Sequence, residues 1–309
     1  MSTSNLTREA VDAATRIQVR LNEHSPWLAR EVRQWMSSLS RSPRIANYFV
    51  NTTMFPMLHL PGWLAHSKLV RLDDHFQSDL TYSTMNGYLY IRLIDNLMDQ
   101  HSGDELRLLP ITAVFHSEFL KSYHRYFPFS HVFWTAFDAY WITSTEVVIK
   151  EATLQSLDYE QFRTIAANKL SAAKIPLVAA CSFYALEDLL QPWLRFFDHL
   201  ACCWQFADDL YDWKKDFQRG TRTYFLSEAV RRKRAGESVQ GWVVREGFAW
   251  GSALLQSWLP SLWQMVDELG SSEMNHYLRR RAMLLHMQTR TILATFESLQ
   301  NLSGISVRA

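Results

Sequence analysis

The sequence predicts an all-α protein, and three observations carry that prediction. Apolar residues recur at three- and four-residue spacing along almost the whole chain, which is the period of helices with one buried face. Residues that break helices are scarce, with 10 glycines and 9 prolines among 309 residues. Signals for β-hairpins are nearly absent, since the Asn86-Gly87 pair lies inside a helical pattern.

The expected helices follow this apolar pattern in chain order, and prolines and glycines set most of the breaks between them. Pro61-Gly62 closes an early element, Ser102-Gly103-Asp104 ends the helix over 82–101, and Pro110 opens the next helix at its first position. Further starts or kinks are expected at Pro128, Pro176, Pro192 and Pro260. The expected helices cover residues 8–22, 27–39, 44–55, 64–79, 82–101, 110–126, 130–151, 158–173, 175–188, 191–218, 223–235, 237–258, 260–269 and 272–301.

Composition predicts one globular domain over residues 1–309. Apolar residues make up 48% of the chain and charged residues 20%, which is enough for a large core and excludes a disordered chain. No repeat, low-complexity tract or long polar linker divides the sequence. The formal net charge of +1 argues against a general nucleic-acid binder, because such proteins need a surplus of basic residues.

Cysteine usage and the N-terminus predict a cytoplasmic protein without a membrane span. The three cysteines, Cys181, Cys202 and Cys203, form no CxxC pair, so neither a disulfide framework nor a structural zinc site is expected. The first 20 residues contain no apolar signal core, and no run reaches the roughly 18 apolar residues of a spanning helix. The most apolar stretch, residues 175–186, is expected to be a buried helix.

Two acidic clusters lie on helices that are otherwise strongly apolar. In the first, Asp95 and Asp99 are four residues apart, so both carboxylates project from one helix face. In the second, Asp208, Asp212 and Asp216 repeat the same spacing over three turns. Each cluster therefore places like charges close together along one side of a helix.

Such clusters disfavour a helix unless something compensates for the repulsion. A like-charge pair at this spacing costs about 0.2–0.5 kcal/mol, and positions that break local rules are often functional. A bound cation would reverse the effect. Magnesium fits best because it prefers oxygen ligands, and no His or Cys accompanies these acids at ligand spacing. The alternative is a solvated acidic helix face without a ligand.

The two clusters resemble the acidic motifs of the class I isoprenoid-diphosphate superfamily, which includes terpene synthases, polyprenyl diphosphate synthases and squalene/phytoene synthases. DNLMD (95–99) is similar to the DDxxD motif, with Asn96 in place of the second acid. DDLYDWKKD (208–216) is similar to the terpene synthase motif (N/D)DLxSxxxE and to the DxxxD of squalene/phytoene synthases. The resemblance implies an all-α single-domain bundle around a central apolar cavity, and three Mg²⁺ ions bound together with a substrate diphosphate.

The resemblance also implies cations for the diphosphate and a lining for the cavity. Positive side chains would stabilise the charge that grows on the leaving diphosphate. Arg163 lies 45 residues before Asp208, a distance similar to that of the upstream Arg in terpene synthases. Arg290, 82 residues after Asp208, resembles their Arg near the C-terminus, although Thr291 replaces the Tyr that usually follows it. The expected diphosphate-binding residues are Arg163, Lys215, Arg222 and Arg290. The expected cavity residues, one turn or two before the acids, are Tyr88, Ile91 and Trp204.

The resemblance implies a terpene cyclase that ionises a C15 or C20 allylic prenyl diphosphate and releases diphosphate. Head-to-head coupling of the squalene/phytoene type is the alternative, because the second motif also fits it well, although coupling would need two diphosphate sites where a cyclase needs one. Chain elongation is disfavoured, since residues 20–45 contain no Gly-Lys-x-x-Arg segment. A non-catalytic helical subunit of a prenyltransferase stays open because of Asn96. The resemblance also allows a homodimer.

Overall fold

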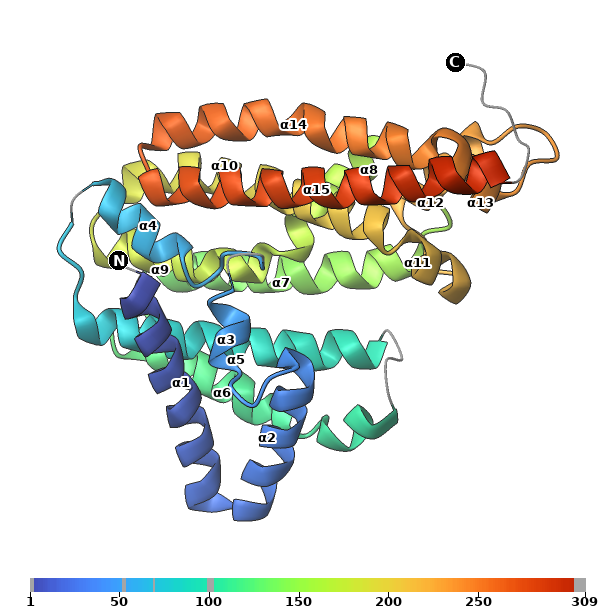
Figure 1. Cartoon of the computed structure of the whole chain (residues 1–309). Helices are drawn as coiled ribbons and strands as arrows, with labels where there is room; N and C mark the ends of the chain where they lie inside the picture. The colour runs from blue at the N-terminus through green and yellow to red at the C-terminus, as the bar shows by residue number, and fades with distance from the viewer. Residues whose placement is uncertain (1–2, 52–53, 69, 99–102, 303–309) are drawn as a thin grey trace. The chain divides into compact units, whose positions relative to one another are not determined.

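The computed structural model describes residues 3–51, 54–68, 70–98 and 103–302, and every regular element within these ranges is helical (Figure 1). The all-α class predicted from the sequence is confirmed. The chain divides into two compact units, one of Met1–Asp138 and Ala173–Leu190, the other of Ala139–Ala172 and Gln191–Ala309. A single domain over residues 1–309 stays a prediction.

In the first unit, one long helix contacts the helices on both sides of it. Its elements are α1 (Thr3–His24), α2 (Pro26–Ser40), α3 (Ala46–Phe49), α4 (Leu60–Ser67), α5 (Asp74–Met98), the 3-10 segment η1 (Gly103–Leu108), α6 (Ile111–His124), the start of α7 (Phe133–Thr153) and α9 (Ile175–Phe183). Helix α5 packs against α1 and, most extensively, against α6. A Cβ on Gly87 would lie 2.9 Å from Cδ2 of Phe119, so only glycine permits this approach of α5 to α6.

The second unit contains most of α10 and the two long C-terminal helices. Its elements are the rest of α7, α8 (Tyr159–Lys169), the first residues of η2 (Ser171–Lys174), α10 (Glu187–Tyr211) from residue 191 onward, α11 (Trp213–Arg219), α12 (Tyr224–Arg232), α13 (Val239–Trp242), the π-helical segment η3 (Val243–Gly247), α14 (Phe248–Leu269) and α15 (Ser272–Leu302). Helices α14 and α15 run alongside each other (Figure 1). Gly251 brings α14 close to α10, because a Cβ there would lie 2.7 Å from Cδ1 of Leu210.

Several expected helix boundaries were wrong, including a break near Pro192, which lies inside α10. The pattern predicted helices over 64–79 and 82–101, whereas α4 ends at Ser67 and α5 runs unbroken from Asp74 to Met98. The true start has a capping signal, since the Asp73 carboxylate accepts a hydrogen bond from the Phe76 N–H at 2.7 Å. A second break, expected before Pro260, is absent because Pro260 lies inside α14. One lost backbone hydrogen bond is tolerated there while Leu255 and Leu262 are buried on the same helix.

The apolar stretch that follows Lys174 forms a buried helix, as predicted. Residues Ile175 to Cys181 of α9 are all buried, and α9 packs against α4 within the first unit. Across the described ranges, each helix is either too short or too polar to span a bilayer.

Candidate functional site

The first acidic motif occupies the last turn of α5. Asp95 is part-exposed, and its carboxylate accepts a hydrogen bond from the Arg92 guanidinium one turn earlier, at 2.9 Å. Asp99, its predicted partner at the metal, lies outside the described residues. The described part of this motif is therefore one accessible carboxylate beside a cation on the same helix.

Asn96, which replaces an acid of the family motif, has a structural role in the first unit. Its side chain is buried, and Nδ2 donates to Glu105 Oε1 at 2.9 Å. The same carboxylate oxygen accepts the indole N–H of Trp35 at 2.7 Å. Asn96 therefore joins α5 to η1 and, through Glu105, to α2. Its side chain is buried and does not face the solvent-exposed side of α5, on which a metal would bind.

The second motif keeps helical hydrogen bonding across the junction between α10 and α11. The Asp212 N–H donates to the Asp208 carbonyl at 2.9 Å, and the Asp216 N–H donates to the Asp212 carbonyl at 3.1 Å. The three aspartates therefore follow one another by single helical turns, as their spacing predicted. Asp208 and Asp212 are exposed, and Lys215 lies 3.8 Å from the Asp212 carboxylate. This row presents oxygen ligands and a cation to solvent together.

A fourth acid, Asp209, lies behind this row and was missed in the sequence. Its pKa is raised to about 7, chiefly by burial. The hydrogen bond from Gln205, at 2.9 Å, and the nearby Lys169 act to lower the pKa. The neighbouring acids Asp216 and Glu151 act to raise it. Lys169 also forms an ion pair with Glu151 at 2.7 Å. Helical geometry could have flagged this residue, because successive side chains turn by about 100° and Asp209 must leave the Asp208 face.

A second missed residue, Arg281 of α15, lies against the same end of α10. Its guanidinium carbon is 3.9 Å from the centre of the Trp204 ring, in cation–π geometry. The Trp204 N–H donates to the Tyr277 hydroxyl at 3.0 Å, which fixes the indole against α15. Burial lowers the pKa of Arg281, and the neighbouring Tyr277, Asp208 and Tyr211 act in the opposite direction. Arg281 therefore brings a partly desolvated positive charge to the Asp208 carboxylate.

Arg163 does not join this group. It lines a cavity of about 520 Å³ in the second unit together with Asp198, His199, Cys202 and other residues of α8, α10 and α14. Its guanidinium lies 3.8 Å from Glu160, and its carbonyl accepts the Cys202 thiol at 3.5 Å. His199 and Asp208 are nine residues apart, so at about 100° per residue they lie on opposite faces of α10. The cavity therefore faces away from the aspartate row.

The other predicted residues occupy varied settings. Arg222 is exposed in the segment before α12, and Arg290 is exposed on α15. Thr289, beside Arg290, shares a hydrogen bond of 2.8 Å with the Tyr211 hydroxyl, which places this turn of α15 beside the second motif. In the first unit, Ile91 is 37% exposed. Tyr88 is half-buried, where its hydroxyl hydrogen-bonds that of a neighbouring tyrosine, Tyr48.

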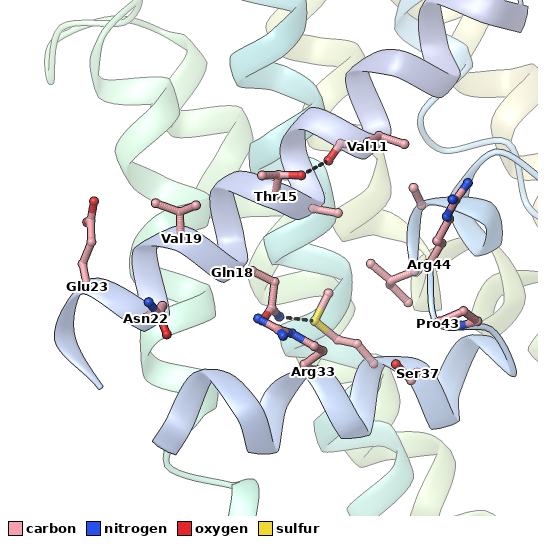
Figure 2. A pocket seen from close by; sticks show the side chains of 14 residues that line it. Val11, Thr15, Gln18, Val19, Asn22, Glu23, Arg33, Ser37, Pro43 and Arg44 are labelled. Atoms are coloured by element: carbon pink, nitrogen blue, oxygen red, sulfur yellow. Dashed lines mark hydrogen bonds between the residues drawn. The ribbon is translucent and has the colours of Figure 1, made fainter. Parts of the chain in front are cut away.

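A separate pocket of about 540 Å³ lies between α1 and α2 (Figure 2). Inside it, Arg33 donates through Nε to Gln18 Oε1 at 3.2 Å, and Gln18 in turn donates to Met36 Sδ at 3.4 Å. Arg44 enters from the segment that follows α2. Within the described ranges, the lining of this pocket includes none of the residues that the sequence predicted for the site.

The donors of the second motif fit a hard divalent cation. Asp208 and Asp212 offer exposed carboxylate oxygens on adjacent turns, and Mg²⁺ binds through a few carboxylates together with phosphate oxygens. Among the described residues, which omit Asp99, no three His, Cys, Asp or Glu side chains form a ready-made metal cluster. These residues therefore offer two or three carboxylates, which would hold a metal ion only together with the oxygens of a phosphate ligand.

Comparison with known proteins identifies the fold. No family model matches the sequence, and no curated protein matches it. Among solved structures, the chain is similar to a geranylgeranyl pyrophosphate synthetase from the archaeon Geoglobus acetivorans, with a TM-score of 0.66 and 13% identity over 92% of this chain and 98% of that one.

Two further solved structures give the same result. An octaprenyl pyrophosphate synthase from Helicobacter pylori matches with a TM-score of 0.59 and 11% identity, over 86% of this chain and 98% of that one. A geranylgeranyl pyrophosphate synthetase from Pyrococcus horikoshii Ot3 matches with a TM-score of 0.54 and 13% identity, over 95% and 99%. The chain therefore has the all-α fold of these prenyl pyrophosphate synthases, which confirms at the level of the fold the class I isoprenoid-diphosphate resemblance predicted from its motifs.

Proposed function

We propose that this chain is an enzyme that acts on prenyl diphosphates and transfers an allylic prenyl group to a second isoprenoid. The solved structures with its fold are prenyl pyrophosphate synthases by name, and the chain covers nearly their whole length. The observation that carries the proposal is the aspartate row at the end of α10, with two carboxylates exposed on successive turns and Arg281 beside the first. A location in the cytoplasm belongs to the same proposal.

The reaction begins with loss of the diphosphate. The bond between the allylic carbon and the diphosphate oxygen breaks, and its electron pair leaves with the diphosphate. The allylic cation then accepts the π electrons of the second isoprenoid to form a new carbon–carbon bond, and loss of a proton from the resulting carbocation restores a double bond. A dry, apolar site is required, because water would otherwise trap the cation.

Each group of charged residues has a proposed part in this step. The metal ligands are Asp95, Asp99, Asp208, Asp212 and Asp216. Magnesium bound there with the diphosphate would supply neutralisation of the leaving group's negative charge. Lys215, Arg222, Arg290 and Arg281 orient the diphosphate and stabilise its growing charge. Arg163 is left out because its cavity lies on the opposite face of α10.

Terpene cyclisation is the second candidate. It is favoured by the match of Asp208, Asp212 and Lys215-Asp216 to the terpene synthase motif, and by the absence of a Gly-Lys-x-x-Arg segment from residues 20–45. In that case the allylic cation would react with a double bond of its own chain. A homodimer is compatible with either candidate.

Product analysis separates the candidates. The purified chain is incubated with Mg²⁺ and C10, C15 or C20 allylic diphosphates, each with and without isopentenyl diphosphate, and products and released diphosphate are measured. A longer prenyl diphosphate that requires isopentenyl diphosphate, or a C30 or C40 product from one substrate, supports transfer. A terpene hydrocarbon or alcohol from a single substrate supports cyclisation. No diphosphate release from any mixture would support the non-catalytic subunit and contradict the proposal.

A further inference from the structure

The turn between α6 and α7 in the first unit exposes two large apolar side chains. Phe129 is 83% exposed and Val132 is 73% exposed, the two highest fractions among the large apolar residues of the described ranges. Keeping a side chain of this size in water forgoes the stabilisation that burial would give. Scattered exposed apolar residues are common, but here the two lie three residues apart on one short turn.

The turn is held firmly from beneath. Phe127 and Phe133 are buried on either side of the exposed pair, and their rings stack at 4.3 Å. The Trp134 indole N–H donates to the carbonyls of Phe127 and Pro128, at 3.2 and 3.1 Å. The exposed side chains are therefore presented by a fixed backbone. Little conformational entropy of the turn is lost when a binding partner buries them.

A layer of rings connects the exposed tip to the unit. The His124 ring stacks on Trp134 at 4.3 Å between centroids, and Phe129 lies 4.6 Å from His124 and 6.2 Å from Trp134. Each of these rings carries apolar faces and, in His124 and Trp134, polar edges. Such amphipathic rings favour the boundary between water and lipid.

The charges around the turn select the occupant. No Asp or Glu occurs between Glu118 and Asp138, while this stretch contains Lys121, Arg125, His124 and His131. The Lys121 and Arg125 side chains are 54% and 66% exposed, although each also pairs with an acid, Glu118 and Asp79 respectively. A second copy of the chain would bring like charge to this surface, whereas an anionic bilayer would bring opposite charge.

We propose that the turn over residues 124–134 binds the surface of an anionic lipid bilayer, with Phe129 and Val132 inserted among the lipids and Lys121 and Arg125 at the headgroups. This proposal does not depend on the proposed function. Binding of the turn to the bilayer is peripheral, because apolar insertion and attraction of opposite charge act together without a spanning helix.

Vesicle flotation tests the proposal on the full chain. Wild type is expected to float with phosphatidylcholine vesicles that contain 30% phosphatidylglycerol, and much less with pure phosphatidylcholine or at high salt, because screening weakens the attraction. The double variant Phe129→Ser/Val132→Ser is expected to bind about tenfold or more weakly, since both insertion groups are lost. Leu106→Ser, which removes a side chain that is 62% exposed elsewhere in the unit, is the matched control and is expected to bind as wild type does.

Other outcomes overturn the proposal. Equal binding of wild type and the double variant would place any lipid contact elsewhere. Absence of wild-type binding to anionic vesicles would remove the lipid surface as occupant. If sedimentation velocity shows a wild-type dimer that the double variant abolishes, and neither protein floats, the turn is a self-association surface instead. Circular dichroism of the variants checks that both remain folded.

Discussion

The guanidinium of Arg281 covers one face of the Trp204 ring, with its central carbon 3.9 Å from the ring centre. Trp204 is one turn before Asp208 on α10, so this contact holds a positive charge beside the first acid of the second motif. The Trp204 ring that the sequence predicted as cavity lining is therefore also a platform for a cation. This gives Arg281 the position expected of a diphosphate-binding residue.

We predict that Arg281→Gln lowers kcat/KM for the prenyl diphosphate by about 10- to 100-fold, the range expected when one charge-assisted hydrogen bond is lost. Arg281→Lys should recover part of the activity, because it keeps the charge without the planar stack. The measurement is steady-state release of diphosphate. Arg280→Gln, at an exposed neighbouring position, should behave as wild type. Equal kinetics in wild type and Arg281→Gln would remove Arg281 from the site.

Exchanging the aspartates should separate activity from stability. Asp208→Asn or Asp212→Asn should lower kcat/KM by about a thousandfold or more, which corresponds to roughly 4 kcal/mol of lost transition-state stabilisation. In the absence of metal, Asp212→Asn should change the free energy of unfolding by less than about 0.5 kcal/mol, because the relief of like-charge repulsion along the row is offset by the loss of the exposed ion pair with Lys215. Urea unfolding and diphosphate release give the two values.

The exposed Glu268 of α14 supplies the control for these exchanges. Glu268→Gln also removes one negative charge from the second unit, and both activity and stability should stay close to wild type. Near-normal activity in Asp212→Asn would show that the row does not bind the metal. A loss of activity accompanied by a loss of helical circular dichroism would instead assign the residue to folding.

The fold class and the acid rows could be predicted because both depend on local periodicity. A separation of four residues determines that Asp208, Asp212 and Asp216 follow one another by turns wherever the helix packs. Helix boundaries were less certain, since the Asp73 cap that starts α5 competes with an apolar pattern that runs on through residues 64–79. Caps act through one hydrogen bond, which an apolar period does not register.

The rest of the site arises from tertiary packing. Arg281 is 73 residues beyond Asp208, and only the packing of α15 beside α10 brings them together. Lys169 reaches Asp209 from α8 in the same way. Arg163 was chosen by its distance along the sequence from Asp208, but that distance does not determine which face of α10 it meets. The combined position of both acidic motifs and the cavity residues stays a prediction.

Gly87→Ala tests the close approach of α5 to α6. The added Cβ would lie 2.9 Å from the Phe119 ring, so the ring or a helix must shift, and we expect a loss of about 1–3 kcal/mol in the free energy of unfolding. Phe119→Leu alone should also destabilise, because it leaves a cavity. In the double variant, the loss in the free energy of unfolding should be smaller than the sum of the two single losses, since the smaller side chain at position 119 makes room for the added Cβ. Strict additivity in urea unfolding would contradict the contact.

The stability of the first unit should also depend on pH through His59. Both ring nitrogens are buried without a hydrogen-bond partner, and burial lowers the pKa of this histidine from 6.5 to about 4. The unfolded chain therefore binds the proton more readily, so the free energy of unfolding should fall as pH falls from about 6.5 toward 4, by up to about 3 kcal/mol. His59→Leu should remove this contribution while keeping the Trp63 contact apolar.

The measurement is urea unfolding of wild type and variant at several pH values, with the His59 contribution taken as the difference between them. Other groups titrate in the same range, including Asp209, and they cancel in that difference because both proteins contain them. His286→Leu replaces an exposed histidine and should leave the pH slope of wild type unchanged. If His59→Leu and wild type lose stability in parallel between pH 6.5 and 4, the ring must find a partner for its proton in the folded chain, and burial is not what sets its pKa.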